Sequence, residues 1–187
     1  MEKVKIIECP RDALQGMNKW VLTADKVSYY QALLKVGFDT LDCLSFVSPK
    51  VIPQMSDAAA VVDRLDLSDT NTKLLAIIAN SRGAKEACSH KTITYLGYPF
   101  SISENFQIRN TNKTIEESVV ELQKIIEIAE KYDKTIVVYL SMGFGNPYGD
   151  PWSIEIMESW VTKMNSFGIK IISLSDTIGM AKLEAIE

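Results

Sequence analysis

The order of hydrophobic and polar positions along the chain predicts six β-strands, each followed by a helical segment. The expected strands are short apolar runs, and the run at residues 73–79, KLLAIIA, has no polar face, which is typical of a parallel strand buried on both sides. Strands are expected at residues 4–7, 38–44, 73–79, 92–96 (extending to about 100), 135–140 and 169–174. Alternation of strand and helix predicts a parallel sheet with right-handed crossovers.

The segments between these strands show apolar residues at helical spacing. Thr114 and Glu117 form a capping box before the clearest helix, at residues 115–131. Thr23 and Asp150 are the expected N-caps of two further helices, the second because a proline follows the aspartate directly. The other helices are expected near residues 23–36, 56–65, 84–88, 151–167 and 180–186.

Two architectures fit six repeated strand–helix units: an open doubly wound sheet and an eight-stranded (β/α) barrel. No GxGxxG motif follows the first strand, so nothing supports a dinucleotide-binding sheet. No break in composition marks a linker, so residues 1–187 are expected to form a single α/β domain.

Composition and charge narrow the class of protein. Of 187 residues, 47% are hydrophobic, which suits a sizeable core, and the net charge of −4 without a basic run argues against nucleic acid as a partner. No apolar stretch reaches the roughly 20 residues of a membrane span. Three cysteines without CxxC spacing, and a first strand that begins at once, predict a cytoplasmic protein with reduced thiols and no signal peptide.

Polar side chains follow all six strands, at the edge where parallel sheets bind ligands. Asp12, Asp42 and Asp176 would repel one another at this edge unless a cation or Arg11 held them. Oxygen ligands favour a hard divalent ion such as Mg²⁺ or Mn²⁺. The pattern therefore predicts metal-assisted chemistry on a small anionic or carbonyl substrate. The strand-end residues are Arg11, Asp12, Gln15, Asp42, Ser45, Phe46, Asn80, Ser103, Glu104, Asn105, Ser141, the loop at residues 143–150, Ser175, Asp176 and Thr177.

Each of these residues, taken singly, also has a structural interpretation. A lone Arg-Asp pair is commonly a surface ion pair that contributes little. Asn80 can be a turn former, Glu104 a solvated loop residue and Asp150 only a helix cap. The functional interpretation therefore depends on the carboxylates occurring together.

Several motifs resemble those of a known family. The run ECPRDALQ at residues 8–15 resembles the opening motif of the 3-hydroxy-3-methylglutaryl-CoA lyases, which are metallolyase TIM barrels. The run SFVSPKVIPQM at residues 45–55 resembles their second-strand signature and is the most specific motif present. The runs with Asn80, Glu104 and Asp176 follow in the family order. This resemblance implies a parallel (β/α) TIM barrel, of which the chain holds about six of eight units.

The resemblance also implies roles for individual residues. Arg11 would polarise the substrate carbonyl and stabilise enolate charge, and Asp12 would be a ligand of the divalent cation. Asp42 stands where the family has a glutamate that supports the arginine, and Asp176 matches an aspartate near the substrate hydroxyl. The catalytic residues would then be Arg11, Asp42 and Asp176, and the substrate-binding residues Arg11, Gln15, Ser45, Asn80, Glu104 and Thr177.

The implied reaction is the retro-Claisen cleavage of 3-hydroxy-3-methylglutaryl-CoA to acetyl-CoA and acetoacetate, a step of leucine degradation and ketone-body formation. The expected partners are an acyl-CoA substrate and a second copy of the chain in a homodimer. Two alternatives stay open: a synthase or aldolase of the same superfamily that acts on a 2-oxo acid, and a truncated, non-catalytic paralogue that acts as a binding or oligomerisation module.

The sequence also departs from the family pattern. Cys9 and Ala13 replace glycines beside the Pro-Arg-Asp motif, while Cys43 and Cys88 are expected to be buried. The family takes two metal-binding histidines from strand seven, whereas the only histidine here, His90, is expected to be solvent-exposed in a turn before strand four. We expect the 187 residues to be the front part of a longer protein, with exposed edges at strands one and six.

Overall fold

A computed structural model describes residues 4–186 of the chain, which divides into two compact units. Unit 1 contains the residues up to Leu96 together with Ile128–Thr135. Unit 2 contains Gly97–Glu127 and the residues from Ile136 onward. That residues 1–187 form a single domain stays a prediction.

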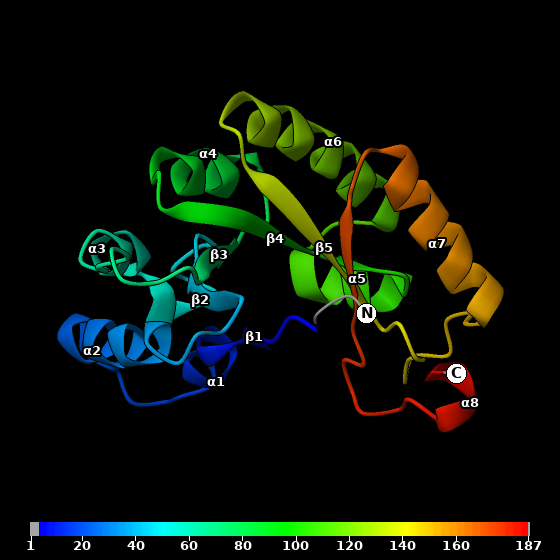
Figure 1. Cartoon of the computed structure of the whole chain (residues 1–187). Coiled ribbons are helices and arrows are strands. Elements are labelled where there is room, and N and C mark those ends of the chain that lie inside the picture. The colour runs from blue at the N-terminus through cyan, green and yellow to red at the C-terminus, as the bar shows by residue number, and fades with distance from the viewer. Residues whose placement is uncertain (1–3, 187) are drawn as a thin grey trace. The chain divides into compact units, whose positions relative to one another are not determined.

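Unit 1 carries the first three strands, the start of the fourth and the helices between them (Figure 1). Its second and third strands are buried along almost their whole length. Its elements are β1 (Ile7–Glu8), α1 (Pro10–Gln15), α2 (Thr23–Leu34), β2 (Thr40–Ser45), the 3₁₀ turn η1 (Pro53–Met55), α3 (Ala58–Val62), β3 (Lys73–Ile77), α4 (Ser81–Ser89) and the first residues of β4 (Ile93–Ser101).

Unit 2 carries the rest of β4 and the elements that follow it (Figure 1). The long helix α6 begins in this unit and ends in unit 1. The elements are α5 (Glu104–Thr111), α6 (Ile115–Lys131), β5 (Thr135–Ser141), α7 (Ile154–Ser166), β6 (Ile171–Leu174) and α8 (Leu183–Ile186).

The strands pair in parallel and follow one another in the sheet in chain order. In unit 1, Ile7 lies opposite Thr40, and β2 pairs with β3. In unit 2, Val137 lies opposite Ile171. Parallel strands linked in this order by helices confirm the predicted α/β fold, a (β/α) TIM-barrel fragment with six of eight units.

Each unit buries its own apolar side chains. In unit 1, Cys43 and Leu74 are completely buried on β2 and β3, as the unbroken apolar run of the third strand predicts. Cys88 is also buried, so the expectation for both cysteines is confirmed. In unit 2, Leu122 and Ile125 form the buried stripe of α6.

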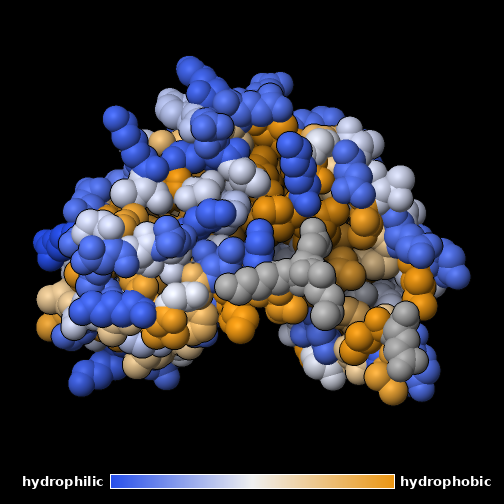
Figure 2. Space-filling model, viewed as in Figure 1, coloured by the Kyte–Doolittle hydropathy of each residue, from blue (hydrophilic) through white to orange (hydrophobic). Residues whose placement is uncertain are grey.

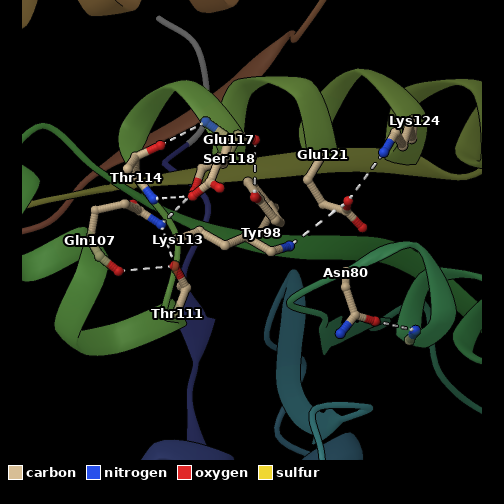
Figure 3. Close-up of polar contacts among 11 residues, drawn as sticks. Asn80, Tyr98, Gln107, Thr111, Lys113, Thr114, Glu117, Ser118, Glu121 and Lys124 are labelled. Carbon is tan, nitrogen blue, oxygen red and sulfur yellow. Dashed lines mark hydrogen bonds and ion pairs between the residues drawn. The ribbon is translucent and has the colours of Figure 1, made fainter.

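The capping box of α6 is confirmed. The hydroxyl of Thr114 accepts the N–H of Glu117 at 3.1 Å, and the Glu117 carboxylate accepts the N–H of Thr114 at 2.8 Å (Figure 3). The expected bounds of this helix, residues 115–131, match the structure.

The other two expected N-caps are wrong. Thr23 is the first residue of α2, and its hydroxyl donates to Asp57 instead of capping the helix. Helix α7 begins at Ile154 with Ser153 as its N-cap, so Asp150 lies outside the helix. In both cases the side chain bonds to a group distant in sequence, which a local pattern does not show.

Two short helices, α1 and α5, were not predicted from the sequence. Pro10 begins α1, where its fixed φ suits the first helical turn. Helix α5 has Ser103 as its N-cap, and the hydroxyl accepts the N–H of Phe106 at 3.2 Å. Arg11 and Asp12 therefore lie on a helix rather than in a loop.

Apolar side chains reach the surface on the first and last strands. Ile6 and Ile7 are exposed at β1 in unit 1, and Ile171 and Leu174 are exposed at β6 in unit 2. Figure 2 shows a further group of apolar residues over α8. Among the described residues, no helix combines the length and apolarity that a membrane span requires.

Gly83→Ala is expected to destabilise unit 1. A Cβ on Gly83 would lie 2.6 Å from the carbonyl oxygen of Phe46, so the loop after β2 would have to move. We expect a loss of about 1–3 kcal/mol in the free energy of unfolding, measured by urea denaturation.

Gly16→Ala is the matched control for this substitution. A Cβ there would meet only the Ala13 oxygen at 3.7 Å, and the φ of −80° suits alanine. Its stability should be unchanged or higher by about 0.5 kcal/mol. Equal stability losses in the two variants would contradict the close approach at Gly83.

Candidate functional site

A buried ion pair between Arg11 and Asp42 lies at the centre of the candidate site in unit 1. The guanidinium donates from Nε to Asp42 Oδ1 at 2.7 Å and from Nη2 to Asp42 Oδ2 at 2.8 Å. Arg11 is 8% exposed and Asp42 is 1% exposed. This two-pronged geometry is the strongest form of arginine–carboxylate pairing, and it fixes the plane of the guanidinium.

The local backbone explains how the two side chains meet. Arg11 is the second residue of α1, directly after Pro10. Asp42 lies on β2 where its register with β3 shifts, because Cys43 is an extra residue between the Asp42 and Leu44 pairs. Such a bulge redirects the neighbouring side chains and is common beside functional sites.

Two other polar side chains of α1 extend the pair. Gln15 Oε1 accepts from Arg11 Nη1 at 2.7 Å, so the glutamine expected to bind substrate also orients the arginine. Asp12 Oδ1 lies 3.5 Å from the same nitrogen, and the Asp12 side chain is 69% exposed. Asp12 is therefore accessible to an external ligand.

The other site residues predicted in unit 1 make local contacts. Ser45 is buried, and its hydroxyl accepts the N–H of Val47 at 3.3 Å. Asn80 caps α4, because its Oδ1 accepts the N–H of Gly83 at 2.9 Å (Figure 3). Both hold the backbone at the carboxyl ends of β2 and β3, and their role toward a substrate stays a prediction.

The predicted site residues of unit 2 likewise organise their own loops. Glu104 Oε2 accepts the N–H of Ile115 at 3.0 Å. Asp176 accepts the N–H groups of two residues after β6, Met180 at 2.8 Å and Ala181 at 3.1 Å. Thr177 is held by the same turn, and its Oγ1 accepts the N–H of Met142 at 2.8 Å.

Met142 has an unusual backbone conformation for a large side chain. Its φ is +59°, and the residue is buried at the end of β5. A methionine in this region carries strain that surrounding contacts must hold. The contact with Thr177 supplies one such constraint, so the loops after β5 and β6 fix each other within unit 2.

Asp150 has a larger role than the sequence suggested. Its carboxylate accepts the hydroxyl of Ser103, the N–H of Asn105 at 3.0 Å and the Nδ2 of Asn105 at 2.5 Å. It thus lies at the N-terminus of α5, where an anion is favoured. The hydrogen bond from Ser103, followed by those from Asn105, lowers the pKa of Asp150 below its ordinary value. The stabilisation is present above the ordinary value of 3.8 and is lost as the pH falls through the lower, folded-state pKa.

Helix α5 is fixed from its other side by a buried polar network. Gln107 accepts the N–H of Ser101 at 2.6 Å. It donates to Thr111 at 2.7 Å and to Ser118 at 2.8 Å (Figure 3). The hydroxyl of Tyr98 donates to the carbonyl of Ser118 at 3.1 Å. The local sequence does not reveal this network, because Gln107, Thr111 and Ser118 look like ordinary polar residues of helix surfaces.

The chain is similar to proteins of a known family. Residues 3–187 match the family model described as HMGL-like. The chain belongs to the HMGL-like family. The resemblance to the hydroxymethylglutaryl-CoA lyase family that the motifs indicate is therefore confirmed.

Several proteins that are similar to this chain are named hydroxymethylglutaryl-CoA lyases. Hydroxymethylglutaryl-CoA lyase YngG of Bacillus subtilis is 33% identical over 190 residues, which cover 100% of this chain and 62% of that protein. The crystal structure of the B. subtilis HMG-CoA lyase superposes with a TM-score of 0.91 at 34% identity, covering 99% of this chain and 62% of that one. An HMG-CoA lyase from Acinetobacter baumannii, in complex with coenzyme A and 3-methylmalate, has a TM-score of 0.90 at 27% identity, covering 98% and 60%. The chain thus spans about three fifths of the length of these three proteins.

Enzymes of the HMGL-like family are metal-dependent, so the donors in this chain matter. Asp12 offers an accessible carboxylate of the kind that Mg²⁺ prefers. A divalent cation takes about six oxygen ligands, however, and the described residues contain no group of three or more His, Cys, Asp or Glu that could hold one. Among residues 4–186, Asp12 is therefore a single accessible donor for a divalent cation rather than part of a complete site.

His90 lies just before β4, as expected, but it is not solvent-exposed. Its side chain is half-buried at the end of α4, its Nδ1 lies 2.9 Å from Asp63 Oδ1, and its ring lies 5.5 Å from that of Phe46. His90 thus contacts Phe46, in the loop after β2, and Asp63, both within unit 1.

Cys9 is expected to react slowly with alkylating agents. Burial, and next the charge of Asp42, raise the pKa of the Cys9 thiol to about 11, although the residue is exposed. At pH 8 the thiolate fraction is therefore small, and labelling by iodoacetamide should be about tenfold or more slower than that of glutathione. The rate should rise with pH up to about 11.

Cys9→Ser provides the control, because Cys43 and Cys88 are buried and the variant should show almost no labelling of the folded chain. Labelling of wild-type Cys9 as fast as that of glutathione at pH 8 would show that the thiol is not in the environment described.

Proposed function

We propose that this chain supplies the carbonyl-polarising part of a carbon–carbon lyase that cleaves 3-hydroxy-3-methylglutaryl-CoA to acetyl-CoA and acetoacetate. The observation that carries this proposal is the buried Arg11–Asp42 pair, which holds a permanent positive charge in a fixed orientation at the end of β1. The names of the relatives and the coenzyme A complex of one of them support an acyl-CoA substrate.

The reaction breaks the bond between C2 and C3 of the substrate. The C3 hydroxyl loses its proton and becomes the ketone of acetoacetate, while the bonding electrons move to C2 and form the enolate of acetyl-CoA. Protonation of C2 then gives acetyl-CoA. Negative charge develops on the thioester oxygen during this step, and a pre-oriented guanidinium stabilises it without reorganisation.

Each residue of the site has a proposed part in this step. Arg11 stabilises the enolate, and Asp42 holds Arg11 with support from Gln15. Asp176 is proposed to act at the C3 hydroxyl, from a turn that its own carboxylate organises. Substrate contacts are proposed for Arg11, Gln15, Ser45, Asn80, Glu104 and Thr177.

The oligomeric state, the location and the metal are proposed from the family resemblance. We propose a homodimer in the cytoplasm, with Mg²⁺ or Mn²⁺ as the metal. Asp12 is the carboxylate through which these residues would contribute to that metal site. The further ligands would come from outside the described residues.

The exposed apolar residues of β1 and β6 favour a second candidate function. Unpaired edge strands with apolar side chains are templates for association with another chain. The protein would then be a non-catalytic binding or oligomerisation module that uses these edges.

Arg11→Met and Asp42→Asn should abolish turnover of 3-hydroxy-3-methylglutaryl-CoA while the protein stays folded. Loss of an electrostatic donor of this kind lowers kcat by about 10²–10³. The measurement is acetyl-CoA production by the native gene product, with circular dichroism to confirm folding. Arg82→Met is the control, since Arg82 forms only an exposed pair with Glu86. Near-normal rates in either site variant would refute the assignment of Arg11.

Mn²⁺ should raise the melting temperature of the native gene product if it is the lyase. A ligand that binds only the folded state stabilises it, by about 2.7 kcal/mol at a hundred times Kd. Asp12→Asn should remove most of this shift, whereas Asp25→Asn, an exposed acidic residue of α2, should not. Absence of a shift in the wild-type protein would favour the second candidate.

A further inference from the structure

Helix α2 of unit 1 contains a lysine that is almost completely buried. Lys26 is 1% exposed, and its ammonium donates to the carbonyl oxygen of Gln54 and to Asp57 Oδ1 at 2.7 Å. It also lies 4.1 Å from the centre of the Trp20 ring, in a cation–π contact. Lysine is rarely buried without partners, and here the carboxylate, the carbonyl and the ring satisfy its charge.

The side chain of Gln54 binds a segment that comes much earlier in the chain. Its Nε2 donates to the carbonyl oxygens of Met17 at 3.3 Å and Lys19 at 2.5 Å, and its Oε1 accepts the N–H of Val21 at 3.2 Å. Gln54 is 5% exposed. One amide therefore holds three main-chain atoms of residues 17–21, the segment between α1 and α2.

Lys26, Gln54 and Asp57 act together, and we name them the Lys26–Gln54 clamp. Lys26 fixes the backbone of Gln54, Gln54 fixes residues 17–21, and the hydroxyl of Thr23 donates to Asp57 Oδ2 at 2.7 Å. The clamp thus ties the start of α2 and the turn η1 to the segment that leaves α1.

Helix α1 depends on such support. It has six residues, which is too short for an isolated helix to be stable in water. Its last turn continues directly into the clamped segment, since the N–H of Met17 donates to the carbonyl of Leu14 at 3.0 Å. The ion pair with Asp42 fixes the guanidinium of Arg11 but leaves the backbone that carries it to be fixed by other contacts.

We propose that Gln54 and Lys26 are positioning residues for Arg11. The two hydrogen bonds to Asp42 set the direction of the guanidinium. The clamp sets the position of the α1 backbone from which the side chain extends. The importance of this positioning for catalysis rests on the proposed function. The positioning itself can be tested without turnover, because the Nε–H of Arg11 is a spectroscopic reporter.

The experiment measures hydrogen exchange of the Arg11 Nε–H and of the amides of residues 17–21 by ¹⁵N NMR. Gln54→Ala should speed exchange at these positions by about tenfold or more, since each of the three lost hydrogen bonds contributes roughly fivefold to local protection. Core amides of β3 should keep a larger share of their protection. Lys26→Met should give the same pattern, and Thr23→Val a smaller effect if Lys26→Met does not fold.

Gln31→Ala is the matched control. Gln31 also lies on α2 and bridges two segments, donating to the carbonyl of Asp66 at 2.8 Å and accepting its N–H at 3.0 Å, but it holds the segment before β3. This variant should leave Arg11 unchanged. Equal acceleration of the Arg11 Nε–H in the Gln31 and Gln54 variants, or none in the Gln54 variant, would overturn the proposal.

Kinetics of the native gene product separate this proposal from the proposed function. If the lyase activity is present, Gln54→Ala should lower kcat more than it changes KM, because a displaced Arg11 weakens contacts made in the transition state. If the wild-type protein has no lyase activity, the proposed function fails, while the exchange result for Arg11 still decides the role of the clamp.

Discussion

The buried charge of Arg11 is the constraint on which unit 1 depends. A guanidinium cannot lose its proton at neutral pH, so the fold must supply a carboxylate wherever the group is buried. Asp42 meets this requirement from inside a buried strand, and the bulge at Cys43 lets that strand place a charged side chain without losing its neighbours on β3. The two hydrogen bonds to Asp42 and the contact with Gln15 together set the orientation of the guanidinium.

Aspartate in place of the glutamate that the family resemblance implies affects how this pair can form. Its side chain is one methylene shorter, and both Arg11 and Asp42 are buried in this chain. Gln15 accepts from Arg11 Nη1, while Nε and Nη2 donate to Asp42. The same electrostatic task is thus divided between one carboxylate and one amide, with the backbone of α1 held in place by contacts from η1.

Local patterns in the sequence predicted the features whose signal lies within a single element. The capping box at Thr114 and the apolar run of β3 are of this kind, and both are confirmed. The family motifs likewise predicted that Asp42 supports Arg11, and the two side chains form an ion pair. Prediction failed where a side chain bonds far along the chain: Asp150 accepts from the start of α5, and Thr23 donates to Asp57. The burial of Lys26 on α2, where it bonds to Gln54 and Asp57, was not predicted at all. Helix α1 was missed because a proline both ends strands and begins helices.

The contacts in unit 2 have a consequence for how that unit unfolds. Asp150 joins the loop after β5 to the start of α5, and the strained backbone of Met142 is joined to Thr177 after β6. Three loops that are distant in sequence therefore share their stabilising contacts. They should open as one cooperative unit rather than one by one, so that disturbance of any single loop releases all three.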